Sequence, residues 1–551
     1  MWRNNMDRGQ EEAKTVFSGY GNLYVKKGER YKTLFDPSEC DQCTIKILKL
    51  SRESYCIQVL GDFDDEECEV LIQPIGDGLS LGYSRKTGSV HWPAFVDGQL
   101  QSMAFVFSED NVKMTPEELT MRFVEMYNRC TYALLTSSDI DTITNDDEGY
   151  DYIGNAATSQ IPDDDYQEPV YELDVSHEAA TKTGAGNVCY SESVRFNKAL
   201  VLRKVKDTVE LQAPKFDSHG FSKSTTGKIL VPGLTTCDNA LLDDTETKLQ
   251  LLSIDDQKLY EYDIEYGKVV QEHTLPSKVR AVTYSAHIAD PTSVYTCLTD
   301  NVAFNLDCRM DPRRNIVMEP GCTLDKYKLT SLKKPFTCHA TTSAGHLVIG
   351  DGAGSIRLYR GPPGSRREDG KYNPKAAQTL LETKVPIVAV DVTSDGSYVV
   401  AVCEKFLLFM PTAYVDDRGA NTTGFVSKMG KKKPAPLKLQ PTSEQLAVLG
   451  GVDNLDFVSG GFDRYGNGGR EVCITAHSGN YIFTWSLEAA KRAEENGRMC
   501  LGESALVKNE VIGISAQIPD KIMYLTDSDI RMAPLKLHER TERGSVRYAY
   551  L

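Results

Sequence analysis

Short hydrophobic runs recur in pairs through the C-terminal two thirds of the chain, and each pair is joined by a tight polar turn. The turns centre on Asp256, Asp300, Gly352, Glu404, Gly479 and Ser528. Most steps between them are near the ~40–50 residues of a propeller blade. Because one hairpin cannot bury both of its faces, neighbouring units must stack. The pattern predicts a mostly β protein with a C-terminal β-propeller of about seven blades over residues 187–540.

The pattern differs in residues 16–135, where short β-like runs give way to a helical period. Thr115-Pro116-Glu117-Glu118 has the features of a helix start: Thr as N-cap, Pro at the first helical position and Glu three residues after the cap. Strands closed by one amphipathic C-terminal helix are typical of a pleckstrin-homology-like β-barrel, and a generic α+β domain is the alternative. The strands are expected at residues 17–25, 31–35, 44–50, 55–60, 69–72, 79–83 and 103–107.

Residues 136–186 lie between these two regions and are strongly acidic. Thirteen carboxylates and no Lys or Arg occur between Arg129 and Lys182. The apolar residues show no sustained period, so the sequence predicts an acidic disordered linker. Its tyrosines are candidates for docking or modification, with a solvated spacer as the alternative; they are Tyr150, Tyr152, Tyr166 and Tyr171. Residues 1–15 are expected to form an N-terminal tail, and residues 541–551 a tail or a closing strand.

The overall composition favours a cytoplasmic globular protein. Hydrophobic residues make up 40% and charged residues 25% of the 551 residues. No run approaches the ~18 apolar residues of a transmembrane helix, and no apolar signal segment follows Met1. The fourteen cysteines are scattered, which is typical of free thiols in a reducing compartment. A net charge of −16 without a broad basic region disfavours nucleic acid as a partner.

Several stretches of the repeated region carry a resemblance to a known family. They are residues 259–270 (LYEYDIEYGKVV), 307–310 (DCRM), 336–342 (FTCHATT), 349–359 (IGDGAGSIRLY), 386–392 and 482–485. These resemble the vacuolar import and degradation protein 27 (Vid27-like) family. The resemblance implies a cytoplasmic protein with a WD40-like propeller, a pleckstrin-homology-like region and no known catalytic site. The acidic linker and insertions at residues 412–440 and 460–469 depart from the family's pattern.

The motifs that could carry chemistry are incomplete, so neither a cofactor nor a metal is predicted and the chain is not expected to be an enzyme. The glycine-rich stretch 350–354 lies between two strands, whereas a dinucleotide loop must open a helix. Residues 224–229 lack the Ser or Thr that follows Lys in a phosphate-binding loop. Cys40 and Cys43 have the spacing of one half of a zinc site, but no second close pair follows.

The candidate binding residues are four cations around the first predicted hairpin: Lys26, Lys27, Arg30 and Lys32. In a pleckstrin-homology-like domain, basic residues at this hairpin can hold the phosphates of an anionic lipid. A charged, solvated turn is the alternative.

The function predicted from these features is a non-enzymatic scaffold that binds other proteins through the propeller faces and the acidic linker. Vesicle traffic and vacuolar import or protein degradation are the candidate processes. The alternative is a peripheral membrane adaptor that makes weak contact with anionic lipid through the N-terminal domain. An enzyme would need an active site built from loops at the central channel of the propeller.

Overall fold

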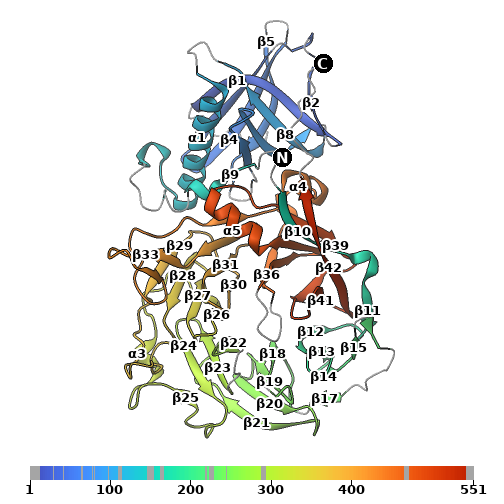
Figure 1. Ribbon diagram of the computed structural model, residues 1–551, viewed down its shortest axis with the longest axis vertical. Coiled ribbons are helices and arrows are strands. Elements are labelled where there is room, and N and C mark those ends of the chain that lie inside the picture. The colour runs from blue at the N-terminus through green and yellow to red at the C-terminus, as the bar shows by residue number, and fades with distance from the viewer. Residues whose placement is uncertain are drawn as a thin grey trace.

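The chain folds into an N-terminal β-domain and a ring of β-sheets that lies beside it (Figure 1). The computed structural model describes residues 13–541 except for 29, 37, 41, 64–65, 77–78, 80, 97, 110–113, 145–149, 151–153, 162–166, 218–219, 223–228, 232, 244, 287–292 and 464–470. Within this part of the chain, no helix is both long enough and apolar enough to cross a membrane.

The N-terminal domain is built around its long first strand, which pairs along both edges and forms a small hairpin with the second strand. The sheet order is β5-β4-β3-β1-β8-β7-β6-β9, with β2 attached to β1. The strands are β1 (Lys14–Lys27), β2 (Arg30–Thr33), β3 (Cys43–Ser51), β4 (Ser54–Phe63), β5 (Glu66–Pro74), β6 (Leu81–Ser84), β7 (Ser89–Val96), β8 (Gln99–Phe107) and β9 (Thr158–Gln160). The pleckstrin-homology-like interpretation of this domain stays a prediction.

Helix α1 (Pro116–Thr136) begins where the sequence predicts. Thr115 caps it, and the reciprocal hydrogen bonds between Thr115 and Glu118 form the capping box. Phe123 and Tyr127 are fully buried against the sheet, because they recur on one face of the helix. The helix therefore supplies the second layer of the N-terminal domain.

Strand β7 is missing from the set expected from the sequence, because Pro93 interrupts an otherwise strand-like run. Proline has no backbone N–H and is normally confined to strand edges. The structure satisfies this limit: β7 pairs with β8 along its whole length, but with β6 only at Ser89, Val90 and His91. Pro93 therefore lies beyond the end of β6. No residue of β6 pairs with it there, so the missing backbone N–H of proline costs no hydrogen bond to that strand.

The ring is a seven-bladed propeller of antiparallel sheets, six of them four-stranded and the last five-stranded, which confirms the predicted propeller. Blade A is β12 (Asn187–Ser193), β13 (Lys198–Val205), β14 (Thr208–Gln212) and β17 (Ile229–Val231); blade B is β18 (Asn239–Leu242), β19 (Lys248–Ser253), β20 (Lys258–Asp263) and β21 (Lys268–Thr274); blade C is β22 (Val279–Tyr284), β23 (Val294–Thr299), β24 (Ala303–Asp307) and β25 (Ile316–Val317). Blade D is β26 (Phe336–Thr341), β27 (Leu347–Asp351), β28 (Ser355–Tyr359) and β29 (Thr379–Glu382); blade E is β30 (Ala389–Val392), β31 (Tyr398–Val402), β32 (Leu407–Pro411) and β35 (Leu437–Leu439); blade F is β36 (Phe457–Phe462), β37 (Cys473–Ser478), β38 (Tyr481–Ser486) and β39 (Gly502–Leu506).

The rest of the propeller consists of a closing blade, two small hairpins and short helices between blades. Blade G contains β40 (Val511–Ser515), β41 (Lys521–Thr526) and β42 (Asp529–Thr541). The hairpins are β15 (Phe216–Asp217) with β16 (Gly220–Phe221) and β33 (Ala413–Val415) with β34 (Asn421–Thr423). The helices are α3 (Leu324–Tyr327), α4 (Ser443–Leu449) and α5 (Leu487–Asn496), and 3-10 turns occur at Ile140–Thr142, Gly154–Ala157, Val175–His177 and Val452–Asn454.

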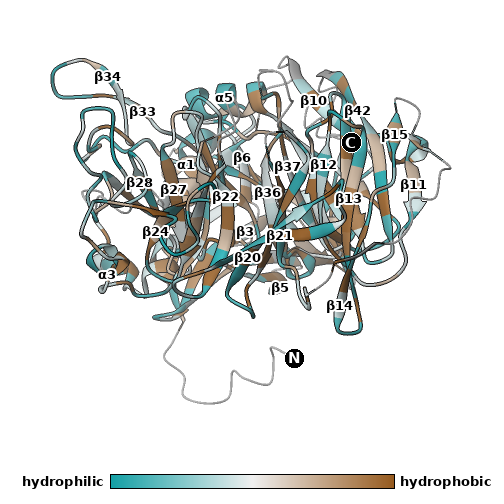
Figure 2. Ribbon diagram, turned by 90° about the horizontal axis from the view of Figure 1, so that it is seen from below, coloured by the Kyte–Doolittle hydropathy of each residue, from teal (hydrophilic) through white to brown (hydrophobic). Residues whose placement is uncertain are grey.

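Each junction between neighbouring blades has its own hydrophobic cluster, which is the packing that a closed ring requires. Junctions A–B, B–C, C–D, E–F, F–G and G–A each enclose a separate cluster. The D–E cluster is continuous with the core of the N-terminal domain. In Figure 2 the hydrophobic colour follows the strands, whereas the loops at both ends of the blades are mostly hydrophilic.

The ring is closed by strands from the segment that the sequence predicts to be disordered. Strand β10 (Gln167–Leu173) pairs with the second half of β42, and β11 (Ala179–Lys182) pairs with its first half. The propeller therefore begins before residue 187, and the expectation of a disordered linker is wrong for these residues. The other proposed closing strand, residues 546–551, lies outside the described residues.

Hydrophobic burial and opposite charges hold this closure together. Val170 and Leu173 of β10 are each 4% exposed. Across the joint, Lys536 pairs with Asp174, and the bond from Lys536 is the largest of the causes that hold the pKa of Asp174 well below its usual range. Arg531, which is 8% exposed, bonds Glu178 in the same way. Carboxylates of the acidic segment thus pair with basic residues of the last strand.

Five inner strands contain a β-bulge at the same place, near their first residue. The extra residues are Val188, Arg280, Thr337, Val458 and Ile512. A bulge redirects one side chain at the rim of a ring. Val458 and Ile512, on the adjacent blades F and G, are 52% and 38% exposed. We call these two residues the apolar pair.

The closure by β10 and β11 predicts that a chain starting at residue 187 is much less stable than one starting at residue 162. Both lack the N-terminal domain, so they differ only in the closing segment. Loss of the buried Val170 and Leu173 alone should cost ~3–6 kcal/mol. Thermal melting and soluble yield of the two truncated chains would measure the difference. Equal melting temperatures would show that β10 and β11 do not close the ring.

Candidate functional site at the domain junction

The four cations predicted as a lipid site do not act as one group, because the hairpin divides them between two faces. In the β1–β2 register, Lys26 lies opposite Tyr31, and Lys27 lies opposite Arg30. Neighbouring residues of a strand point to opposite faces of the sheet. Lys26 therefore shares a face with Tyr31, whereas Lys27, Arg30 and Lys32 share the other face.

Lys26 faces the propeller and is occupied there. Its ammonium group pairs with Glu444 of α4 and lies 5.9 Å from the ring centre of Tyr31. The side chain of Lys26 is 22% exposed and that of Glu444 is 51% exposed. The structure thus gives Lys26 a partner within the chain that the sequence analysis did not foresee.

Lys27, Arg30 and Lys32 are exposed, and no ion pair joins them to another residue of the described chain. Three cations on one face of a short hairpin form a positive surface that is open to solvent. An anionic group could approach this surface without displacing a partner. The candidate lipid site is therefore reduced to these three residues.

Helix α4, which receives Lys26, is fixed to the propeller by its own caps. Thr442 and Gln445 form a capping box, and Gly450 ends the helix at a φ of 81°. Gln445 uses both ends of its amide: Oε1 accepts from the Thr442 N–H, and Nε2 donates to the carbonyl of Gly502 at 2.8 Å. The helix is therefore held to strand β39 before it meets the N-terminal domain. The sequence analysis missed this helix, although its Thr-x-x-Gln pattern and the following glycine are the signals that could have predicted it.

A chain of hydroxyl groups crosses the junction next to the ion pair. Tyr31 bonds Ser102 at 2.8 Å, and Ser102 bonds Ser443 of α4 at 2.7 Å. His91 packs edge-on against the Tyr31 ring, with 5.4 Å between centres, and bonds Ser89 at 2.9 Å. Burial, assisted by the charge of Lys26, lowers the pKa of His91 to about 3. The imidazole is therefore neutral at physiological pH.

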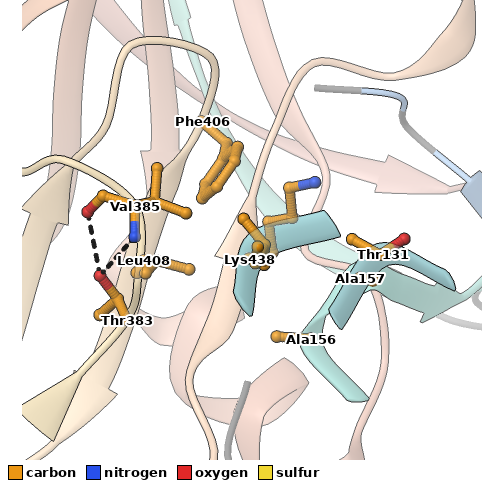
Figure 3. A pocket seen from close by; sticks show the side chains of 9 residues that line it. Thr131, Ala156, Ala157, Thr383, Val385, Phe406, Leu408 and Lys438 are labelled. Atoms are coloured by element: carbon orange, nitrogen blue, oxygen red, sulfur yellow. Dashed lines mark hydrogen bonds between the residues drawn. The ribbon is translucent and has the colours of Figure 1, made fainter. Parts of the chain in front are cut away.

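A hydrophobic seam forms the second contact between the two domains. Leu135 and Ala157 face Val385, Phe406 and Leu408 of the propeller around a cavity of about 30 Å³ (Figure 3). A cavity of that size has room for no more than one or two waters. Lys438 lies over the Phe406 ring at 4.3 Å. The seam is a packed interface rather than a ligand pocket.

The acidic segment itself provides a third contact between the domains. Its strand β9 pairs in parallel with β6 of the N-terminal sheet. Just beyond α5 of the propeller, the Met499 N–H donates to the carbonyl of Gln160 at 2.8 Å. Residues 158–160 are thus bonded to both domains.

Two of the other sequence motifs have structural roles, and the lysine-containing stretch 224–229 lies almost wholly outside the described residues. Residues 350–354 form the turn between β27 and β28, where Asp351 accepts from the backbone N–H groups of Ala353 and Ser355. The thiols of Cys40 and Cys43 lie 3.9 Å apart, and burial raises the pKa of Cys43 to about 12. In the residues that the structure describes, no three His, Cys, Asp or Glu side chains gather in a way that could hold a metal ion.

The propeller matches a known family over most of its length. Residues 221–533, more than half of the chain, match the VID27 C-terminal WD40-like domain. The chain belongs to the VID27 family. This confirms the resemblance inferred from the sequence.

Two VID27 relatives show how much of the chain is shared. Vacuolar import and degradation protein 27 of Schizosaccharomyces pombe is 28% identical over 358 residues, and that of Saccharomyces cerevisiae is 23% identical over 342. These alignments cover 61% and 59% of this chain but only 41% and 40% of the relatives. The chain thus spans about two fifths of the length of these curated relatives. The β-propeller domain of Cps50 (Swd1) from Myceliophteria thermophila covers 66% of this chain and 100% of its own length, at 12% identity and a TM-score of 0.41.

The Lys26–Glu444 pair predicts a small but measurable coupling between the two domains of this VID27 chain. Partly exposed ion pairs contribute ~0.5–1 kcal/mol. K26E and E444K should each lower the melting temperature slightly, and the double charge swap should restore it. Thermal melting of the four proteins gives the coupling energy. Strictly additive effects would show that the pair does not form.

His91 predicts an acid-sensitive N-terminal domain. The unfolded chain protonates this histidine near its ordinary pKa of 6.5, whereas the folded protein does so only at about 3. The folded state therefore loses stability as the pH falls below 6.5, by ~2 kcal/mol at pH 5. H91Q should remove this part of the pH dependence. Denaturant unfolding at pH 7.5 and pH 5 measures it, and an unchanged slope in H91Q would contradict the assignment.

Proposed function

We propose that this VID27 chain is a non-enzymatic protein-interaction scaffold in vacuolar import and protein degradation, working in the cytoplasm. The name of the two relatives supports the process. The WD40-like propeller supports a binding role, because a ring of blades presents broad, rigid surfaces made of loops.

The observation that carries the proposal is the apolar pair. Val458 and Ile512 lie at the start of inner strands on adjacent blades, where β-bulges redirect them, and both are well exposed. Neighbouring apolar side chains held exposed on a rigid frame are typical of a protein-binding surface. The N-terminal domain lies beside the ring rather than over it (Figure 1).

The positions of two strongly perturbed groups also support binding over catalysis. Burial lowers the pKa of His339 to about 4 and raises that of Glu192 to about 8. Both side chains are at most 5% exposed. His339 bonds Thr283 and the Thr296 carbonyl. Groups enclosed in this way shape the core rather than meet a substrate.

Affinity capture of the tagged full chain, followed by mass spectrometry, tests the scaffold. We expect V458D/I512D to lose a defined set of partners, because a carboxylate desolvated in an apolar contact is costly. V270D is the matched control, since Val270 is 43% exposed on the outer strand β21. If neither the wild type nor V270D retains any partner above an untagged control, the scaffold proposal is wrong.

A second candidate function, contact with anionic lipid, is favoured by three exposed cations of the hairpin that have no ion-pair partner in the described part of the chain. If they bind phosphoinositide, the full chain should sediment weakly with vesicles containing that lipid, and the binding should fall as salt is raised. K27E/R30E/K32E should remove it, whereas K204E, a change at an exposed lysine of the propeller, should not. Binding that is insensitive to salt and to the triple change would exclude the hairpin as the site.

A further inference from the structure

A basic pocket lies between blades C and D, on the face of the propeller opposite to the apolar pair. The pocket has a volume of about 410 Å³, within the usual range for ligand sites. Its wall combines Asn305 of β24 and Val317 of β25 with residues 344–346 between β26 and β27 and with the loop that follows β28. Ser285 and residues 344–346 of the wall follow the last residues of the inner strands β22 and β26, whereas the apolar pair lies near the first residues of inner strands.

The pocket concentrates positive charge in an acidic protein. The two loops that border it, residues 307–317 and 360–375, contain eight Lys or Arg and four Asp or Glu, although the whole chain has a net charge of −16. Three arginines line the cavity: Arg360, Arg366 and Arg367. A local excess of this kind is not needed for folding, because exposed cations contribute little to stability.

Only one of the three arginines, Arg367, is paired with a carboxylate in the described residues. Arg367 is held by Asp369 through two parallel bonds of 3.1 and 2.8 Å. Arg360 and Arg366 are exposed, and no carboxylate in the described residues pairs with either of them. Arg360 and Arg366 therefore line one cavity without a carboxylate partner in the described residues, and the same wall also contains the carboxylate of Glu368.

Neutral donors complete the wall of the pocket. His346 stacks on Phe425 with ring centres 5.0 Å apart and planes inclined by 11°, which fixes the imidazole. Burial and the charge of Arg360 lower the pKa of His346, so it contributes a neutral ring at physiological pH. The Oδ1 of Asn305 accepts from the Thr296 hydroxyl at 2.8 Å, which leaves its amide N–H groups as donors.

We propose that this pocket binds a phosphorylated side chain of a partner protein. A phosphoryl group carries nearly two negative charges and three acceptor oxygens, which match two guanidinium forks and neighbouring neutral donors. A carboxylate carries a single charge and would leave one arginine unmatched. The proposal rests on the scaffold function, and it specifies phosphorylation as a signal for recruitment of one class of partner.

An array of paired phosphorylated and unphosphorylated peptides tests the proposal on the full chain. We expect phosphorylated members to bind roughly tenfold or more tightly than their pairs, because charge-assisted bonds are strong. R360A/R366A should lose that preference, and R360K should lose much of it, since lysine lacks the bidentate fork. K371A is the matched control: Lys371 is an exposed cation of the same loop that does not line the pocket. Unchanged melting temperatures establish that the variants fold.

Three outcomes would overturn the proposal. They are equal binding of both members of every pair, a phosphate preference that survives in R360A/R366A, and equal binding to peptides with Asp or Glu in place of the phosphorylated residue. Vesicles containing phosphatidylinositol 4-phosphate form a separate arm, and binding to them but to no peptide would assign the pocket to membranes instead. If R360A/R366A and phosphatase treatment leave the captured partners unchanged, this proposal fails while the scaffold function stands.

Discussion

The structure depends on a joint between the two ends of the propeller. Strand β42 pairs with β41 on one edge and with β10 and β11 on the other, so the last blade is completed by residues that precede the first. Each blade is stable only against its neighbours, and without this joint two apolar edges would meet water. All seven junctions between blades enclose a hydrophobic cluster because the ring is complete.

The same segment also determines where the N-terminal domain lies. Residues 158–160 extend the N-terminal sheet, and residues 167–173 pair with β42 only a few positions later. The short distance along the chain forces the domain against the edge of the ring. The hydrophobic seam at Phe406 and the α4 contact at Lys26 then fix its orientation. Ring closure and domain docking therefore involve the same segment of the chain.

The sequence predicted the elements whose pattern is local and missed those that depend on distant partners. The propeller hairpins and the capped start of α1 were predicted because alternation and capping are readable over a few residues. Strand β7 was missed because Pro93 is tolerated only beyond the end of β6. Strands β10 and β11 were missed because their acidic composition predicts disorder, while the basic residues that stabilise them, Arg531 and Lys536, lie more than 340 positions away.

The candidate site shows the same limit at the level of single residues. The sequence placed Lys26, Lys27, Arg30 and Lys32 on one hairpin, and the hairpin exists, but only the β1–β2 register shows that Lys26 points to the other face. Its partner Glu444 belongs to a helix in another domain. The cations of the pocket between blades C and D are also unremarkable in the sequence, because Arg366 and Arg367 are followed directly by Glu368 and Asp369. The structure shows that Asp369 pairs with Arg367. Arg360 and Arg366 line the same cavity and have no carboxylate partner in the described chain, which is what identifies them as candidate binding residues. In an acidic protein, unmatched cations that line a shared cavity are a stronger sign of a binding site than the number of basic residues.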